Sequence, residues 1–109
     1  MSEEKILTFG EYIRELREST GLPLRKVAAQ LDIDPSLLGK IERNSRPPNI
    51  EIIKKLADIF GQNENNLITE YLSDQIAYKI IEVHGDVNVL KVAEKKIDYI
   101  IKQKNEQKT

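Results

Sequence analysis

Hydrophobic residues recur along this chain with the 3.6-residue period of amphipathic helices. The first helix is predicted to begin after Thr8, because Glu11 follows at the spacing of a capping box, and to end near Gly21. A second, short helix is predicted over roughly Leu24–Leu31. The tight connection Asp32-Ile33 then leads directly into a third helix.

The third helix has clear start and stop signals. Asp34 is a suitable N-cap, and Pro35 occupies the first helical position, where a missing N–H removes no helical hydrogen bond. The helix is predicted to run to about Arg43, with Asn44 as a left-handed C-cap. The proline-containing segment 45–48 then forms an extended loop.

Two more helices complete the pattern of the first 70 residues. Asn49 is predicted to cap a fourth helix that Gly61 ends. Asn63 is predicted to cap a short fifth helix that carries Leu67, Ile68 and Leu72.

The remainder of the chain, from about Tyr71, predicts two amphipathic helices separated by His84-Gly85-Asp86. Their apolar positions are spaced by three or four residues: Leu72, Ile76, Ile80 and Val83, then Leu90, Ala93, Ile97 and Ile101. The polar segment Lys102–Thr109 is expected to fray.

Composition excludes several classes of protein. The 109 residues are 39% hydrophobic and 32% charged, which is typical of one helical domain with a short appendage. The absence of cysteine excludes disulfides and thiolate metal sites, and a single histidine, His84, argues against a histidine metal site or a catalytic triad. No apolar run is long enough for a membrane span, and Met1–Lys5 does not resemble a signal peptide, so a cytoplasmic protein is expected.

The net charge of −1 does not by itself favour nucleic-acid binding, because phosphate neutralisation supplies much of DNA affinity. The local distribution differs from the total. Between residues 25 and 46 there are five basic residues (Arg25, Lys26, Lys40, Arg43, Arg46) against three acidic ones (Asp32, Asp34, Glu42). One face of the domain is therefore expected to be positive.

Two short helices joined by a very short turn are the geometry of a helix-turn-helix. Five segments extend this pattern: Ile13-Arg14-Glu15-Leu16-Arg17, Val27-Ala28, Leu38-Gly39-Lys40-Ile41-Glu42-Arg43, Arg46-Pro47-Pro48 and Leu56-Ala57-Asp58-Ile59-Phe60-Gly61. In this order they resemble the phage repressor/Cro-like (Xre-type) helix-turn-helix regulators over about residues 8–70.

The resemblance implies an all-α protein, with a five-helix repressor-like DNA-binding domain in residues 1–70 and a helical extension in residues 71–109. It also implies a sequence-specific regulator of transcription that binds double-stranded DNA. No enzymatic activity, cofactor or metal is expected, because the sequence has no Gly-rich phosphate loop, no cluster of metal-ligating residues and no placed catalytic base. A controller protein of a restriction–modification system is the favoured kind.

The resemblance makes the third helix the recognition helix, whose N-terminal side chains reach base edges in the major groove. The implied base contacts are Asp34, Ser36, Leu37 and Lys40. Lys40 can instead contact only phosphate, and Leu37 can either meet a thymine methyl group or pack against the second helix. Ser36 can donate or accept, so its base preference stays open.

The implied phosphate contacts lie on both sides of the recognition helix: Arg25, Lys26, Arg43, Asn44 and Arg46. Arg46 can instead be a solvated loop charge. The resemblance also pairs Arg17 with Glu42 in a structural salt bridge, against the alternative of two solvated charges. Pro23 and Leu24 depart from the family, which often has Ser or Thr followed by Gln there, so a frequent polar DNA contact is missing.

A single helix-turn-helix contacts few base pairs, so the protein is expected to bind a palindromic operator as a homodimer. The expected interface is the apolar stripe of the extension: Tyr71, Leu72, Ile76, Ile80, Leu90, Ile97 and Ile101. Two alternatives stay open for these residues, namely packing onto their own domain and binding a toxin or another protein. An antitoxin or a protein-interaction module with a helix-turn-helix fold is therefore the alternative function.

Overall fold

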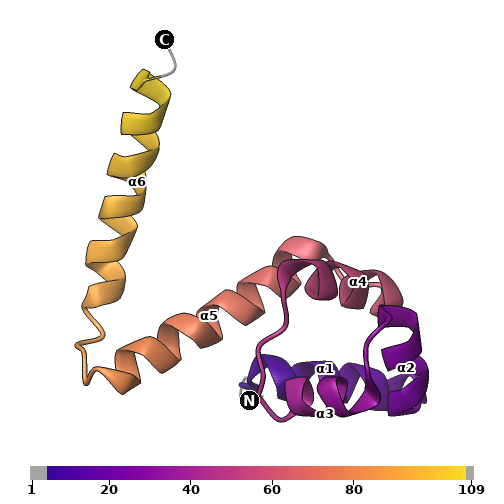
Figure 1. Ribbon diagram of the computed structural model, residues 1–109. Helices are drawn as coiled ribbons and strands as arrows, with labels where there is room; N and C mark the ends of the chain where they lie inside the picture. Colours follow the sequence, from indigo (N-terminus) through magenta and orange to yellow (C-terminus); the bar gives the residue numbers. More distant parts are fainter. Residues whose placement is uncertain (1–4, 108–109) are drawn as a thin grey trace. The chain divides into compact units, whose positions relative to one another are not determined.

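The structure is a computed structural model that describes residues 5–107, and in that range it contains only α-helices (Figure 1). The all-α prediction is therefore confirmed. The bounds of the helices are α1 Phe9–Ser19, α2 Leu24–Leu31, α3 Pro35–Glu42, α4 Ile50–Phe60, α5 Glu64–Glu82 and α6 Val89–Gln107.

The first helix begins at the predicted capping box. The hydroxyl oxygen of Thr8 accepts a hydrogen bond from the backbone N–H of Glu11, and the Glu11 carboxylate accepts one from the backbone N–H of Thr8. Each contact satisfies a donor that would otherwise have no partner at the start of the helix. Gly21 follows the helix with a left-handed φ of 72°, as its position after the last apolar residue predicted.

The third helix begins as predicted and ends one residue earlier than expected. Asp34 accepts a hydrogen bond from the backbone N–H of Ser36, and Pro35 is the first helical residue. The C-cap is Arg43, and Asn44 is the left-handed residue just after it, with a φ of 60°. This left-handed position is one that Asn tolerates better than most residues.

The chain after Asn63 differs from the expectation of a short fifth helix followed by a separate one. α5 is a single helix of 19 residues, Glu64–Glu82. No Gly or Pro lies between these two ends, so nothing in the local sequence stops the helix near Leu72.

The predicted break at residues 84–86 is confirmed. α5 ends at Glu82, His84 has a left-handed φ of 54°, and α6 begins at Val89. α6 is helical to Gln107, although the polar composition after Lys102 predicted fraying. Lys108 and Thr109 lie outside the described residues, as do Met1–Glu4.

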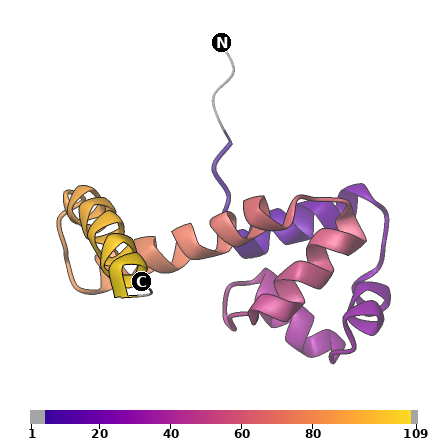
Figure 2. The same ribbon diagram turned by 90° about the horizontal axis from the view of Figure 1, so that it is seen from above.

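The chain divides into two compact units, residues 1–75 and 76–109. In the first unit α1 packs on α3 and α4, and α2 packs on the same two helices (Figures 1 and 2). The boundary between the units falls inside α5. The first half of this helix belongs to the first unit and contributes Leu67 to its core. Among residues 5–75 of this unit, the core consists of twelve buried apolar side chains: Phe9, Ile13, Val27, Ala28, Leu31, Leu38, Ile41, Ile53, Leu56, Ala57, Phe60 and Leu67.

None of the helices described between residues 5 and 107 is both long enough and apolar enough to cross a lipid bilayer.

Candidate nucleic-acid interface

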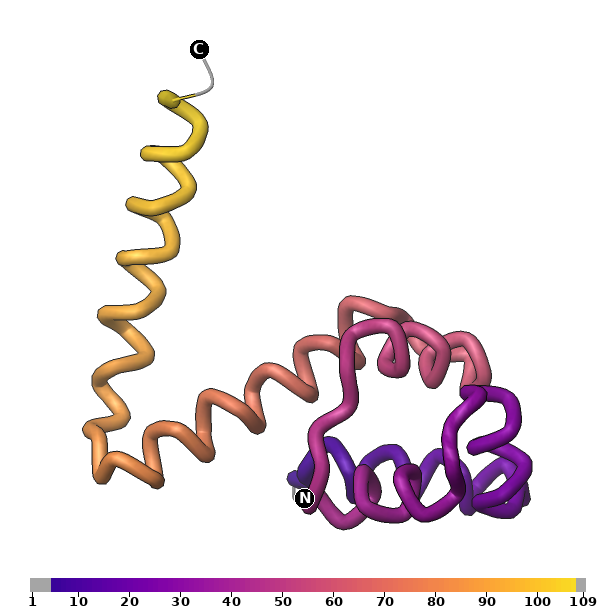
Figure 3. The backbone as a smooth tube through the Cα atoms, in the orientation of Figure 1, coloured from indigo at the N-terminus to yellow at the C-terminus, as the bar shows by residue number. Residues whose placement is uncertain are grey.

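α2 and α3 are joined by only three residues, Asp32, Ile33 and Asp34, and Figure 3 shows this tight connection in the backbone. Asp32 makes the turn possible with a left-handed φ of 56°. Its N–H and that of Ile33 donate to backbone oxygens of α2, so the end of that helix is closed. The fully buried Ala28 of α2 is small, which allows the two helices to pack closely.

An ion pair joins α1 to the C-terminal turn of α3. The Nε of Arg17 donates to Glu42 Oε2 at 2.7 Å, and its Nη2 donates to Oε1 at 3.0 Å, a two-pronged contact. The side chains are only 14% and 5% exposed. Hydrogen bonding to Glu42 raises the pKa of the Arg17 guanidinium above its ordinary value. The carboxylate is therefore occupied within the domain, and its role is to hold α3 in place.

A second connection between α1 and α3 was not predicted. The amide oxygen of Asn44 accepts a hydrogen bond from the backbone N–H of Gly10 at 3.0 Å, and its Nδ2 donates to the Thr8 hydroxyl at 2.7 Å. Gly10 is buried against the end of α3, where a Cβ would lie 2.5 Å from the backbone oxygens of Glu42 and Ile41. The position of Gly10 inside a helical pattern is the one sequence signal that could have indicated this close approach of α1 to α3.

The outward face of α3 carries most of the predicted base contacts. Asp34, Ser36 and Lys40 are exposed. Leu37 is half-buried and packs against the core, so at least part of this side chain is used within the domain. Its contact with a thymine methyl group stays a prediction, as do the base contacts of the other three residues.

Asp34 and Ser36 are joined to each other at the start of α3. Asp34 Oδ1 accepts hydrogen bonds from both the backbone N–H and the hydroxyl of Ser36, each at 2.8 Å. The backbone contact and then the hydroxyl contact, together with the nearby charge of Lys40, hold the pKa of Asp34 below its ordinary value. Asp34 therefore keeps its negative charge at neutral pH.

Exposed basic residues precede and follow α3 in the chain. Arg25 and Lys26 are exposed in the first turn of α2, and Arg43 and Arg46 are exposed after α3. Pro23, the N-cap of α2, supplies no side-chain hydrogen bond to the helix, so backbone donors there are available to an anion. The predicted phosphate contact Asn44 is also exposed, but both polar atoms of its side chain are bonded within the domain.

The residues of the predicted dimer interface differ in their surroundings. Tyr71 packs edge-on against Phe9, with ring centroids 5.6 Å apart, and lies against the core of the first unit. Ile80 is half-buried, while the other members are exposed: Leu72, Ile76, Leu90, Ile97 and Ile101.

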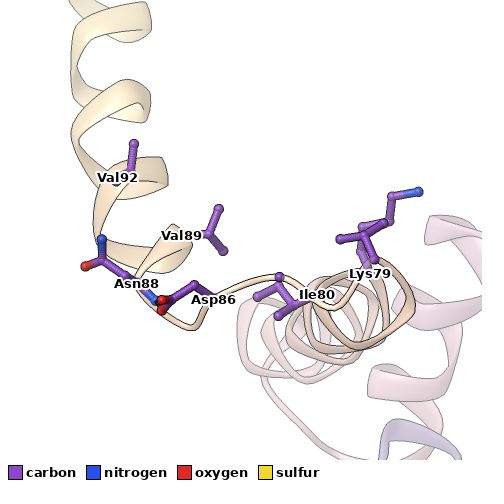
Figure 4. A pocket seen from close by; sticks show the side chains of 8 residues that line it. Lys79, Ile80, Asp86, Asn88, Val89 and Val92 are labelled. Carbon is purple, nitrogen blue, oxygen red and sulfur yellow. Dashed lines mark hydrogen bonds between the residues drawn. The ribbon is translucent and has the colours of Figure 1, made fainter.

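An open groove of about 400 Å³ lies in the second unit, between the end of α5 and the start of α6. Figure 4 shows Ile80 and Val89 on facing sides of it, with Val92 one turn further along α6. No residue of α6 is buried. The second unit therefore presents apolar side chains without a buried core of its own in the described residues.

Comparison with known families agrees with this geometry. Residues 10–73 match the family described as "Helix-turn-helix domain", which is more than half of the chain. The protein belongs to this family, and its resemblance to the phage repressor/Cro-like (Xre-type) regulators is confirmed.

Curated relatives are regulators of the same class. The chain is 33% identical over 69 residues to the HTH-type transcriptional regulator DdrOP3 of Deinococcus deserti, a match covering 62% of this chain and 54% of the relative. It is 29% identical over 69 residues to the HTH-type transcriptional regulator RamB of Mycobacterium tuberculosis, covering 56% of this chain and 15% of that one. The chain thus spans about half, or less, of the length of these relatives.

Among solved structures, the restriction-modification controller protein C.AhdI from Aeromonas hydrophila is 33% identical, with a TM-score of 0.52, and covers 55% of this chain and 91% of its own. The clp gene regulator ClgR from Corynebacterium glutamicum is 17% identical, with a TM-score of 0.54, and covers 94% of this chain and 97% of its own. This second likeness concerns the fold alone.

Proposed function

We propose that this protein is a DNA-binding transcriptional regulator that inserts α3 into the major groove and binds a palindromic operator as a homodimer. One observation carries the proposal. α3 is braced from behind by the buried Arg17–Glu42 pair, while Ser36 and Lys40 on its outer side are left exposed. A rigidly held helix with exposed polar side chains is what base recognition in the major groove requires.

The surrounding charges support the same orientation. Arg25 and Lys26 lie at the start of α2, and Arg43 and Arg46 lie just after α3, so basic side chains flank the recognition helix on both sides. In a helix-turn-helix the phosphates on the two sides of the groove take such positions, and contacts to them fix the register of the protein. These four side chains are proposed phosphate contacts. Asn44 can contact a phosphate only through the Nδ2 hydrogen that is not bonded to the Thr8 hydroxyl.

The first test is selection from a randomised duplex pool across a salt series, with wild type beside Lys40→Ala. A palindromic site should be enriched, its affinity should fall steeply with salt, and Lys40→Ala should alter either the selected bases or the salt slope. Lys54→Ala, which removes an exposed positive charge from α4, is the matched control and should leave the selected bases unchanged. No enrichment even at low salt would overturn the proposal.

Dimerisation is proposed through α5 and α6. Leu72, Ile76, Leu90, Ile97 and Ile101 are exposed apolar residues. The second unit has only 34 residues and no buried core among those that the structure describes, so it has little stability of its own. Pairing with a second copy would remove these side chains and the groove beside Val89 from water, at about 25 cal/mol per Å² of apolar surface.

Sedimentation equilibrium tests the pairing. Wild type should be a dimer at tens of micromolar, and Ile97→Glu should be a monomer, because it places a charge on a side chain that is 56% exposed in the single chain. Lys96→Glu, a change of charge at the neighbouring exposed position, should remain a dimer. A monomeric wild type would overturn the dimer and leave the DNA-binding proposal to the selection experiment.

The exposed apolar residues of α5 and α6 also support a second candidate, a regulator whose C-terminal helices bind a different protein such as a toxin. In that case the wild type purified alone is a monomer, and the partner encoded beside it co-purifies from the native operon. Ile97→Glu should then abolish the co-purification.

Likeness to a restriction-modification controller protein supports the proposal that the regulator acts on its own promoter. A reporter driven by the upstream region of its own gene should change output when the protein is supplied. An unchanged reporter would reject autoregulation but not DNA binding.

A further inference from the structure

We propose that Asp34 and Ser36 act together as a pair of hydrogen-bond acceptors that selects a cytosine in each half-site of the operator. The inference rests on the proposed function, since it concerns what the exposed start of α3 recognises. It goes further by assigning a base to side chains whose preference the sequence left open.

The direction of one hydrogen bond decides the chemistry of Ser36. A serine hydroxyl can donate or accept, so it does not by itself favour any base. Here its oxygen lies 2.8 Å from Asp34 Oδ1, and an ionised carboxylate can only accept. The hydroxyl proton is therefore directed to Asp34, and only the acceptor lone pairs of Ser36 remain for a ligand.

Asp34 contributes the second acceptor. Its Oδ1 is used by Ser36, whereas its Oδ2 accepts no hydrogen bond from any of the described residues. Both side chains are exposed at the end of the helix that enters the groove. The start of α3 thus presents two acceptors, one of them charged, and no side-chain donor.

The four bases differ in what they offer to such a pair. In the major groove cytosine presents its N4 amino group as a donor, whereas guanine presents the acceptors O6 and N7 and thymine presents the acceptor O4. Adenine offers a donor at N6 but an acceptor at N7 beside it. Cytosine is therefore the best match, adenine is a partial match, and guanine and thymine are repelled.

Lys40 fits the same assignment. It lies four residues after Ser36, on the same face of α3, and is exposed. A lysine is the donor that guanine O6 and N7 accept, so the two ends of this face complement the two bases of C·G pairs. The acidic residue at the start of the recognition helix is then part of the specificity and not a defect of a DNA-binding surface.

Asp34→Asn is the sharpest variant, because Asn is as good an N-cap as Asp and the change is nearly isosteric. The Asn Oδ1 can still accept from Ser36, while the Nδ2 places a donor where the second carboxylate oxygen was. Together with the Ser36 acceptor this donor complements N6 and N7 of adenine. The variant should therefore move the preference at one position of the half-site from cytosine to adenine.

The control must remove the same charge elsewhere, because loss of any negative charge strengthens binding to all DNA. Asp58 is an exposed carboxylate on α4, outside the two helices of the helix-turn-helix. Asp58→Asn should raise affinity for every sequence by a similar factor and leave the base preference unchanged. Ser36→Ala, which removes one acceptor, should weaken the preference for cytosine without creating a new one.

The experiment measures dissociation constants, at one salt concentration, for the selected operator and for every single-base-pair substitution of one half-site. Wild type should lose about tenfold or more at one cytosine when it is replaced by thymine or guanine, and less when it is replaced by adenine. Thermal melts followed by circular dichroism verify that each variant is folded.

Two negative results are distinguishable. If the selected site binds wild type, Asp34→Asn and Asp58→Asn with the same base profile, the acceptor pair is overturned while the regulator stands. If no site is selected at all, the proposed function itself fails.

Discussion

Gly10→Ala is expected to destabilise the protein, against the usual effect of this substitution in a helix. Replacing Gly by Ala in a helix normally stabilises it by up to about 1 kcal/mol. At Gly10, however, the new Cβ would lie 2.5 Å from the backbone oxygens of Glu42 and Ile41 and 2.6 Å from Asn44 Oδ1. Two of these atoms belong to the backbone of α3, so no side-chain rotation can relieve the contact.

The size of the effect follows from the displacement. A carbon atom and a carbonyl oxygen that are not bonded approach to about 3.3–3.6 Å, so α1 and α3 must separate by roughly 1 Å. Overpacking of this kind costs about 1–3 kcal/mol, and stretching the hydrogen bond from Gly10 to Asn44 costs about 1 kcal/mol more. After the helix-propensity gain is subtracted, a loss of about 2 kcal/mol in the free energy of unfolding is expected.

Gly39→Ala is the matched control, since Gly39 is also a buried helical glycine. The closest atom to its Cβ would be Arg43 Nη1 at 3.1 Å, the end of a flexible and exposed side chain. This variant should be neutral or stabilised by up to about 1 kcal/mol.

Urea unfolding followed by circular dichroism measures both glycine variants, and the melting temperature of Gly10→Ala should fall on the order of 10 °C. A Gly10→Ala variant as stable as wild type would show that the close approach of α1 to α3 does not exist in solution.

Arg17→Met should lower the free energy of unfolding by about 3 kcal/mol in the same assay, because it leaves the buried Glu42 carboxylate without its guanidinium partner. Arg14→Met breaks an exposed pair and should cost less than about 0.5 kcal/mol, so equal losses in the two variants would show that burial of the ion pair has no effect. Hydrogen bonds from the backbone N–H of Thr8 and then from its hydroxyl hold the pKa of Glu11 below its ordinary value. The ionised Glu11 carboxylate therefore stabilises the folded protein fully above about pH 4.3, the ordinary pKa of Glu in the unfolded chain. This stabilisation is lost as the pH falls through the lower pKa of the folded state. Below about pH 4.3 the free energy of unfolding should therefore fall less steeply with decreasing pH for Glu11→Gln than for wild type. The same dependence on pH in both proteins would contradict the capping box.

Local signals in the sequence predicted the first four helices closely. The capping box at Thr8, the Asp34-Pro35 start of α3 and the Asn49 cap with its terminal Gly61 each act within a few residues, so they can be seen in a single chain. The prediction of a separate fifth helix was wrong, because it divided one apolar pattern at a position where no residue interrupts the helix.

The site divides in a similar way. The positions of Lys40, Arg25 and Arg46 on the surface followed from helical spacing and from the resemblance to a family. The use of Asn44 as a link to Gly10 could not be predicted, because the two residues are 34 positions apart and each has an ordinary local explanation.

The spacing of residues along the chain was enough to predict where the first four helices begin and end, that they form a helix-turn-helix, and which residue types lie on its outer face. These properties depend on short-range spacing, which a linear chain contains in full. The folded structure was needed to show that the start of α1 lies close enough to α3 to exclude a Cβ and that Leu37 packs against the core. It was also needed to show that the proton of Ser36 is directed to Asp34, because the donor or acceptor role of a hydroxyl is set by the group that lies within reach of it.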